Sequence, residues 1–414
     1  MDQMFEIAAG IDVHRDTVVV TVRRRRERTD ELETKTFETF RDDLVEMTSW
    51  LGSKGVQVVG LESTGVYWRP VIRAIKERLP SVQTWVLNPN HIKQMPGRKS
   101  DVTDSQWISR LVLYGHVSPS FLPSADLCEL RELTRHRTKV VADRTRYKNR
   151  IIKSLESNGV KLASVCSDVF GETGRAILDA LVKGEDMTPA RIAECARGSL
   201  RDKVDLLSRA VRDTLVPSTA TVLRQMLLRF DSLDDDIRDL DAQILSLLAP
   251  YTEQVPRLCE VPGVDSVAAA SILAETGPDL LSFPTARHLA SWAGLSPGSN
   301  ESAGKAKPAP TRKGNKYLRT ILVQCVQSAK KTKGTFWQRR YRQLVRLGPK
   351  KAAVALARRL LHTIYALLRF RQSYKDPDLT PPPPHRLSRI VNNLATRIEA
   401  LGFKVTIEAR QTVS

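Results

Sequence analysis

The feature that most constrains the fold of this 414-residue chain is an unbroken apolar seam near its middle. Over residues 218–249, apolar side chains recur at alternating spacings of three and four, which keeps them on one side of an α-helix for about four heptads. The members are Leu223, Met226, Phe230, Leu233, Ile237, Leu240, Ile244 and Leu247. This seam predicts a coiled-coil helix; the alternative is a core helix of a bundle.

A second long helix is predicted over residues 125–157. The apolar residues on its heptad frame are Leu130, Leu133, Val140, Tyr147 and Ile151. The same frame also places Arg137 and Arg144 on the seam, so this repeat is imperfect. We expect the long helix at 218–249 to pair antiparallel with this one, or to pair subunits.

The segments on either side of these helices differ in character. Residues 5–115 follow the order three strands, helix, strand, helix, strand, helix, which predicts an α/β domain with a mixed sheet. Residues 255–370 are predicted to be helical, and LCEVPGVDSVAAASILAETG resembles a helix-hairpin-helix. We therefore predict an α/β domain (1–117), a coiled-coil spacer (118–254), an all-α domain (255–372) and a Pro-rich linker with a tail (373–414).

The positive charge is concentrated in one region. The chain carries a net charge of +19, yet residues 305–375 hold 20 Lys and Arg and no acid, while the remainder has 45 basic and 46 acidic residues. A solvated face normally mixes both signs, so this segment predicts a polyanionic partner, with nucleic acid favoured over a membrane surface. Binding to a phosphate backbone would weaken steeply with salt.

Several protein classes are excluded by composition. No run of about 18 apolar residues predicts a membrane span, and the N-terminal segment lacks the basic start and apolar core of a signal peptide. The five cysteines form no CxxC pair, which argues against a disulfide framework and against a zinc knuckle. We expect a cytoplasmic, nucleoid-associated protein.

Four acids stand where predicted strands end or predicted helices begin. Asp12 follows the first strand, Glu62 ends VQVVGLE, and Asp101 and Asp104 are three residues apart at the start of one predicted helix. Converging carboxylates repel one another, and hard oxygen ligands favour Mg²⁺ or Mn²⁺ over Zn²⁺. Two such ions about 4 Å apart can support in-line phosphoryl transfer.

Each acid also has a structural interpretation. Asp12 can be a turn residue, Asp101 a helix N-cap, and Asp104 a first-turn partner of the helix dipole. Asp16 is a weaker competitor for the role of Asp12, and His14 is expected to be structural or close to DNA rather than a ligand.

A Gly/Ser/Pro-rich loop over residues 294–319 is the second candidate site. It offers three serines as exposed nucleophile candidates: Ser296, Ser299 and Ser302. The cations in and after it are Lys305, Arg312, Lys313, Lys316 and Arg319. A serine hydroxyl among cations can attack a phosphodiester, but the segment can equally be a loop that only contacts phosphate.

Taken together, these motifs resemble the IS110 family of insertion-sequence transposases. GIDVH, LESTGVYWRPV and NPNHIKQMPGRKSDVTDSQWISRL are similar to its Asp-Glu-Asp-Asp signatures on a RuvC-like (RNase H-like) domain. VPGVDSVAAASILAETG, ESAGK and TRKGNKYLR are similar to its C-terminal serine transposase domain. The resemblance runs in order over residues 6–370.

The resemblance implies a mechanism and partners. Asp12, Glu62, Asp101 and Asp104 match the family's metal-binding tetrad, and Ser302 matches its catalytic serine, which forms a phosphoserine link to DNA. Family members act as oligomers whose sites combine two subunits, and some are guided by an element-encoded bridge RNA. The family often has Ser-Gly-Gly where this chain has Ser302-Ala303-Gly304, which leaves Ser299 as the second choice of nucleophile.

The predicted function is therefore Mg²⁺-dependent DNA transposition through a serine–DNA intermediate, with backbone phosphates held by the loop cations. Two rival functions remain open at this point. One is a plain RuvC-like metal nuclease without a covalent step. The other is a nucleic-acid-binding protein without catalysis.

Overall fold

The computed structural model divides the chain into two compact units, Met1–Leu122 and Pro123–Ser414. The structure describes residues 5–27, 29–63, 65–89, 92, 103–212, 215–298, 301–302, 305–306, 310–311, 313–377, 384–399, 402 and 404–406. The division falls five residues after the predicted end of the α/β domain. The predicted boundaries after residues 254 and 372 lie inside the second unit and stay predictions.

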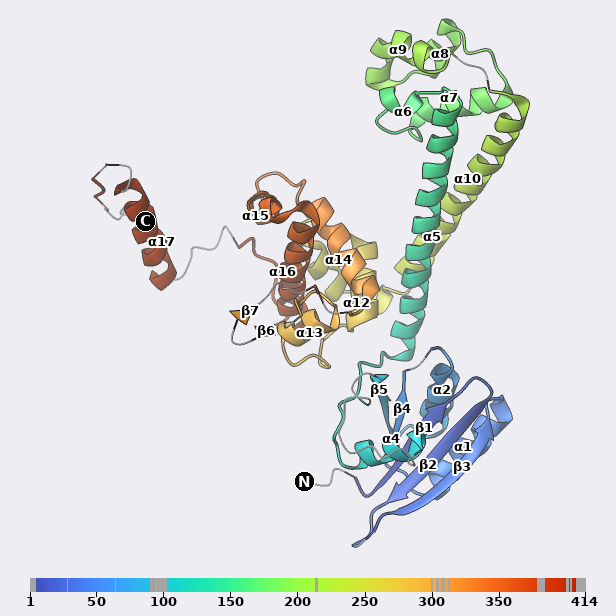
Figure 1. The fold of residues 1–414 in the computed structure, drawn as a ribbon, viewed down its shortest axis with the longest axis vertical. Coiled ribbons are helices and arrows are strands. Elements are labelled where there is room, and N and C mark those ends of the chain that lie inside the picture. Colours follow the sequence, from blue (N-terminus) through green and yellow to red (C-terminus); the bar gives the residue numbers. More distant parts are fainter. Residues whose placement is uncertain are drawn as a thin grey trace. The chain divides into compact units, whose positions relative to one another are not determined.

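The first unit contains the predicted order of strands and helices (Figure 1). Its described elements are β1 (Ile7–Val13), β2 (Thr17–Arg24), β3 (Glu31–Glu38), α1 (Arg41–Ser53), β4 (Val58–Glu62), α2 (Trp68–Arg78), β5 (Gln83–Leu87) and α4 (Asp104–Leu113). β3 begins three residues earlier than the predicted strand at TKTFETF, because its exposed first half pairs with β2 despite its polar sequence.

The five strands form one mixed sheet in the order β3-β2-β1-β4-β5. β1, β2 and β3 are antiparallel neighbours, whereas β4 and β5 run parallel to β1. The mixed sheet predicted from the sequence is confirmed, and this strand order is that of an RNase H-like domain. The carboxyl ends of β1, β4 and β5 consequently lie at the same edge of the sheet.

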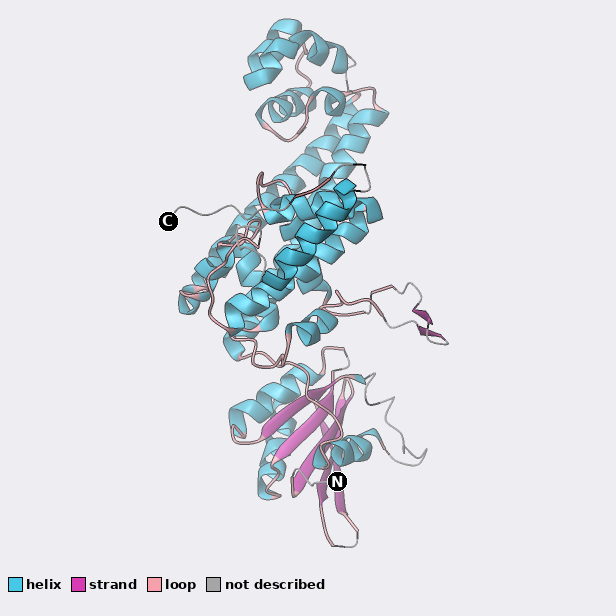
Figure 2. Ribbon diagram, turned by 90° about the vertical axis from the view of Figure 1, so that its left-hand side faces the viewer, coloured by secondary structure: helices cyan, strands magenta, loops and turns pink. Residues whose placement is uncertain are grey.

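Different helices cover the two faces of the sheet. Figure 2 shows the strands of the first unit with helices on both sides. On one face, Ala9, Ile11, Val59 and Leu61 pack with apolar residues of α1 and α2. On the other face, Ala8, Val58 and Leu87 pack with α4. Because side chains alternate along a strand, every second residue of β1 and β4 faces α4.

The second unit is helical. Its described elements are α5 (Ala125–Ser157), α6 (Leu162–Val165), α7 (Glu172–Lys183), α8 (Pro189–Cys195), η1 (Gly198–Lys203), α9 (Val204–Ala210), α10 (Pro217–Ser246), η2 (Ala249–Tyr251), α11 (Gln254–Cys259), α12 (Ser266–Thr276), α13 (Ala286–Trp292), β6 (Glu301–Ser302), β7 (Lys305–Ala306), α14 (Lys316–Ala329), α15 (Phe336–Leu344), η3 (Val345–Leu347), α16 (Pro349–Arg369) and α17 (Pro384–Glu399). No helix of the described residues is long and apolar enough to cross a membrane.

α5 and α10 pack along each other, and Figure 1 shows them side by side. Arg137 of α5 forms an ion pair with Asp241 of α10, and Arg144 forms one with Asp234. From the first ion pair to the second, the residue number rises by seven on α5 and falls by seven on α10. The two helices are therefore antiparallel. The two arginines that interrupt the predicted seam are therefore paired with acids. Knobs-into-holes packing along the seam stays a prediction.

Within the helix-hairpin-helix-like segment, α12 forms the second predicted helix, whereas α11 lies mostly before the segment and ends at its second residue, Cys259. The helix-hairpin-helix itself stays a prediction. Gly263 of the turn has φ +86°, and a Cβ there would lie 2.4 Å from the Cys325 carbonyl of α14. This glycine is required by close packing on α14. A phosphate contact by the turn stays a prediction.

We predict that the ion pairs set the register of α5 and α10. Arg137→Asp places two carboxylates opposite each other and is expected to lower the free energy of unfolding by about 1–2 kcal/mol. Arg137→Asp combined with Asp241→Arg should restore most of the loss. Thermal unfolding of the two single variants and the double variant measures the coupling; purely additive effects would contradict it.

Candidate active site

Two of the predicted acids lie side by side at one edge of the sheet. Gly10 of β1 is the register partner of Gly60 of β4, and Ile11 is the partner of Leu61. Asp12 and Glu62 are the next residues along the two parallel strands. Since each lies two positions beyond its glycine, both are on the α4 face of the sheet.

The third acid is brought to the same place by close helix packing. A Cβ on Gly10 would lie 2.1 Å from the carbonyl oxygen of Ser105, and one on Gly60 would lie 2.3 Å from Val112 Cγ2. α4 therefore lies directly against the two strands, which only glycine permits at these positions. Asp104 is the first residue of α4, one position before the contact with β1.

A polar network holds this end of α4 against β2. The Thr21 hydroxyl hydrogen-bonds to the Ser105 hydroxyl at 2.8 Å. The buried Arg23 guanidinium donates to Ser109 Oγ at 3.1 Å and to Asp30 at 2.9 Å. The side chains of Thr21 and Arg23 lie on the same face of the sheet as that of Asp12. Their contacts therefore fix the position of α4 relative to the sheet.

The electrostatics of Asp12 agree with this geometry. Burial raises the pKa of the Asp12 carboxyl, the His14 side chain lowers it, and the nearby carboxylate of Asp104 raises it. His14 Nε2 lies 3.1 Å from Asp12 Oδ2, and the imidazole is 61% exposed. Asp12 and Asp104 thus repel each other across a short distance, which a cation would relieve.

The helix that was predicted to start near Asp101 begins at Asp104, after Thr103 in an extended conformation. Asp101 itself lies outside the described residues. Among the residues that the structure describes, no group of three or more His, Cys, Asp and Glu side chains has metal-holding geometry.

The loop with the candidate serines contains a hairpin. Ser302 of β6 pairs with Lys305 of β7 across residues 303–304, which lie outside the description. Nearer the base, Pro297 and Thr311 form an antiparallel bridge. Ser302 therefore sits next to the turn of a two-stranded arm. Ser299, the second choice, lies outside the described residues, and Ser296 stands just before the bridge.

The base of this arm is tied to a buried ionic cluster. Asn315, which caps α14, donates from its backbone N–H to the Trp292 carbonyl and from Nδ2 to Glu275 at 2.6 Å. Glu275 is 1% exposed and accepts two hydrogen bonds from Arg135, with Arg131 3.5 Å away. One buried carboxylate thus connects α5, α12 and the end of the loop.

The predicted phosphate contacts differ in their surroundings. Lys313 is exposed, and Lys316 is exposed with its ammonium 5.1 Å from the Tyr317 ring centroid. Arg319 donates to Thr311 Oγ1 at 3.0 Å and so supports the arm. Lys305 has its backbone in β7, and Arg312 lies outside the described residues.

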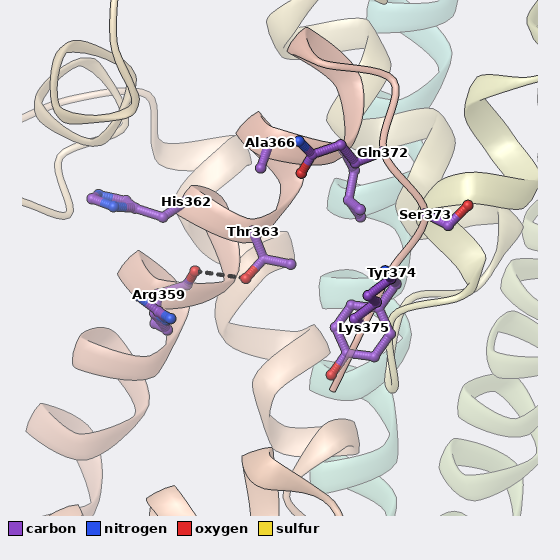
Figure 3. Close-up of a pocket in the computed structure, with 9 residues that line it drawn as sticks. Arg359, His362, Thr363, Ala366, Gln372, Ser373, Tyr374 and Lys375 are labelled. Carbon is purple, nitrogen blue, oxygen red and sulfur yellow. Dashed lines mark hydrogen bonds between the residues drawn. The ribbon is translucent and has the colours of Figure 1, made fainter. Parts of the chain in front are cut away.

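A cavity of about 760 Å³ lies beside the end of α16 (Figure 3). Its lining includes Arg359, His362, Gln372, Tyr374 and Lys375. Burial lowers the pKa of His362, and the neighbouring arginines lower it further. The cavity belongs to the strongly basic segment, and its lining favours an anion over a cation.

Two family models match the chain in sequence order. One, described as "Transposase" and modelling the DEDD domain of IS110, matches residues 9–158. The other, described as "Transposase IS116/IS110/IS902 family", matches residues 255–342. The two matches together span more than half of the chain and name the same family. The chain belongs to the IS110 family of transposases.

Relatives of this IS110-family chain are insertion-element proteins. A 42 kDa protein of insertion element IS900 from Mycobacterium paratuberculosis is 27% identical over 67% of this chain and 73% of its own length. The transposase for IS1111A from Coxiella burnetii is 24% identical over 71% and 73%. The y4pF/y4sB protein of Sinorhizobium fredii is 32% identical over 44% of this chain, which spans about half (48%) of that relative.

Thermus thermophilus RuvC is one of the solved structures to which the chain is similar. The match covers 28% of this chain and 99% of RuvC, at 13% identity and a TM-score of 0.22. A similarity this weak carries no argument about the site. The RNase H-like assignment depends on the strand order and strand directions of the first unit.

Sequence reasoning missed two groups in this IS110-family chain. The contact of His14 with Asp12 could not be seen in the sequence, although it is compatible with the structural role predicted for His14. Glu275 attracted no attention, although an acid inside the apolar run SILAETG needs a buried partner. A charged residue within an apolar run was the feature of the sequence that could have indicated a buried ion pair. The arginines on α5 are its partners.

We predict that Gly10→Ala disrupts the packing of α4. The added Cβ meets backbone atoms that cannot move without shifting the helix, so unfolding should become easier by about 2 kcal/mol or more. Gly52→Ala is the matched control, because its Cβ would meet only the flexible end of Leu79 at 3.2 Å. Equal melting temperatures for both variants would contradict the packing argument.

We predict that Glu275 is a major stabilising residue of the second unit. Glu275→Ala leaves two partly buried guanidinium groups without their carboxylate and should cost about 3 kcal/mol of unfolding free energy. Glu275→Gln should cost less, because one oxygen acceptor remains. Glu156→Gln, at a more exposed ion pair with Lys161, is the control and should change the melting temperature little.

Proposed function

We propose that this protein is a transposase that cleaves and rejoins DNA with Mg²⁺ bound by its RNase H-like domain. The observation that carries the proposal is the position of Asp12 and Glu62 at the carboxyl ends of two adjacent parallel strands, with Asp104 at the start of the helix that packs on the same face. Membership of the IS110 family agrees with it. Mn²⁺ would be an acceptable substitute for Mg²⁺ because both ions prefer oxygen ligands.

The acids are proposed to act as metal ligands, with Asp101 as the fourth. Their donor atoms are all carboxylate oxygens, which fit a hard divalent cation. When bound, the cation would lower the energy of the negative charge that develops on the attacked phosphate. His14 beside Asp12 orients that carboxylate by its contact at 3.1 Å.

Ser302 is proposed as the nucleophile. Its hydroxyl oxygen attacks the scissile phosphorus, the bond from phosphorus to the departing DNA oxygen breaks, and the proton leaves to solvent or a base. The resulting phosphoserine diester retains the bond energy for rejoining. Support comes from the resemblance of ESAGK to the family's serine motif and from the position of Ser302 opposite Lys305 in a two-stranded arm.

The positive charge of the second unit is proposed to hold nucleic acid. Lys305, Arg312, Lys313 and Lys316 would contact backbone phosphates, while Arg319 supports the arm through Thr311. We further propose a bridge RNA as guide, so that base pairing selects the DNA site, and a homodimer or homotetramer in which the acidic and serine sites come from different subunits.

Two alternative functions make different demands on these residues. A plain metal nuclease needs the acids but not Ser302. A non-catalytic nucleic-acid-binding protein needs neither. The charge repulsion between Asp12 and Asp104 favours catalysis over binding alone.

A covalent-trapping experiment tests the proposal. Full-length protein is incubated with Mg²⁺, DNA spanning the element end and co-transcribed RNA, beside Asp104→Asn, Ser302→Ala and Ser296→Ala. We expect a protein–DNA adduct on denaturing gels for wild type and Ser296→Ala, and a loss of at least 100-fold for the other two variants.

The possible results separate the alternatives. Cleavage without an adduct in wild type, with full activity of Ser302→Ala, would establish the plain nuclease. Salt-sensitive DNA binding without any cleavage would establish the non-catalytic protein. An adduct that persists in Ser302→Ala but disappears in Ser299→Ala would move the nucleophile to the second candidate.

A further inference from the structure

An exposed apolar turn follows the Glu62 end of β4. Val66 is 59% exposed and Tyr67 is 45% exposed, although both have large apolar surfaces. Tyr67 is five residues after Glu62, which limits the separation of their Cα atoms to about 17 Å. Apolar side chains this accessible, so close to a candidate site for DNA cleavage, require an explanation.

The turn is held firmly from both sides. Before it, Ser63 donates hydrogen bonds from its N–H and its hydroxyl to the Leu87 carbonyl of β5. After it, Trp68, the first residue of α2, packs against the apolar core that α1 and α2 cover. The Arg69 N–H donates to the Val66 carbonyl at 3.2 Å. Tyr67 is therefore presented by anchored neighbours.

A row of cations continues from this turn along α2. Arg69, Arg73 and Lys76 are spaced four and three residues apart, so they share one side of the helix. All three are exposed. An aromatic ring at the head of a cationic track is the combination that binds single-stranded nucleic acid, since bases stack on the ring while cations follow the backbone.

We propose that Tyr67, assisted by Val66, stacks on an unpaired nucleobase of the DNA strand that approaches the acidic site, with its backbone along Arg69, Arg73 and Lys76. This deepens the proposed function and depends on it for the identity of the strand. The ligand is an unstacked base and not a protein surface, because the apolar patch is only two residues wide and is bordered by cations.

Fluorescence of 2-aminopurine tests the stacking directly. The base analogue is placed in turn at each position of a single-stranded extension on an element-end duplex, and full-length protein is added without Mg²⁺ so that no cleavage occurs. We expect quenching at one position for wild type and Tyr67→Phe, and none for Tyr67→Ala. Affinity for the extension should fall about tenfold in Tyr67→Ala, or about 1.4 kcal/mol.

Leu32→Ala is the matched control, because Leu32 is 43% exposed and lies at the opposite end of the sheet. It should bind and quench like wild type. Quenching by Tyr67→Ala equal to wild type would overturn the proposal. A molar mass of Tyr67→Ala in sedimentation that differs from that of wild type would also overturn it, because it would identify a contact between subunits. Failure of the proposed function would be distinguishable, since wild type would then not cleave DNA when Mg²⁺ is added.

Discussion

The contact between α4 and the two glycines of the sheet is the constraint on which the acidic site depends. Gly10 and Gly60 are partners on adjacent parallel strands, and their missing side chains let the helix lie directly against the strands. Any larger residue would lift α4 and carry Asp104 away from Asp12. The repulsion between these acids is tolerated because packing and the Thr21–Ser105 hydrogen bond hold the helix in place.

The second unit uses the opposite kind of constraint, a buried charge. Glu275 lies in the apolar interior and is stabilised by arginines of α5 and by the amide that caps α14. Removing the arginines would leave the Glu275 carboxylate buried without a counter-charge, so this one acid ties the three segments together. The arm with Ser302 begins and ends at this assembly. Its base is therefore held by hydrogen bonds to the helices, which suits a nucleophile that must be presented to a phosphate.

Much of the secondary structure could be predicted from local patterns. The helix over residues 125–157 follows from its heptads, and the succession of strands and helices along the first unit follows from alternating segments. The acids Asp12 and Glu62 could be placed at strand ends because a strand is recognisable from its own residues. The start of the following helix was harder to predict, because several polar residues from Asp101 onward can cap a helix, whereas α4 begins at Asp104.

The sequence by itself determined the repeating patterns, the residue types at the strand ends and the location of the positive charge, because these depend on neighbours along the chain. Only the tertiary structure decided that Arg137 and Arg144 meet aspartates on α10, that Glu275 is buried among arginines, and that His14 contacts Asp12. Those pairings join residues that are far apart in the sequence. A sequence pattern contains no information on the distance between segments that only packing brings together. The glycines show the difference most clearly: their positions are visible in the sequence, but the helix that requires them is not.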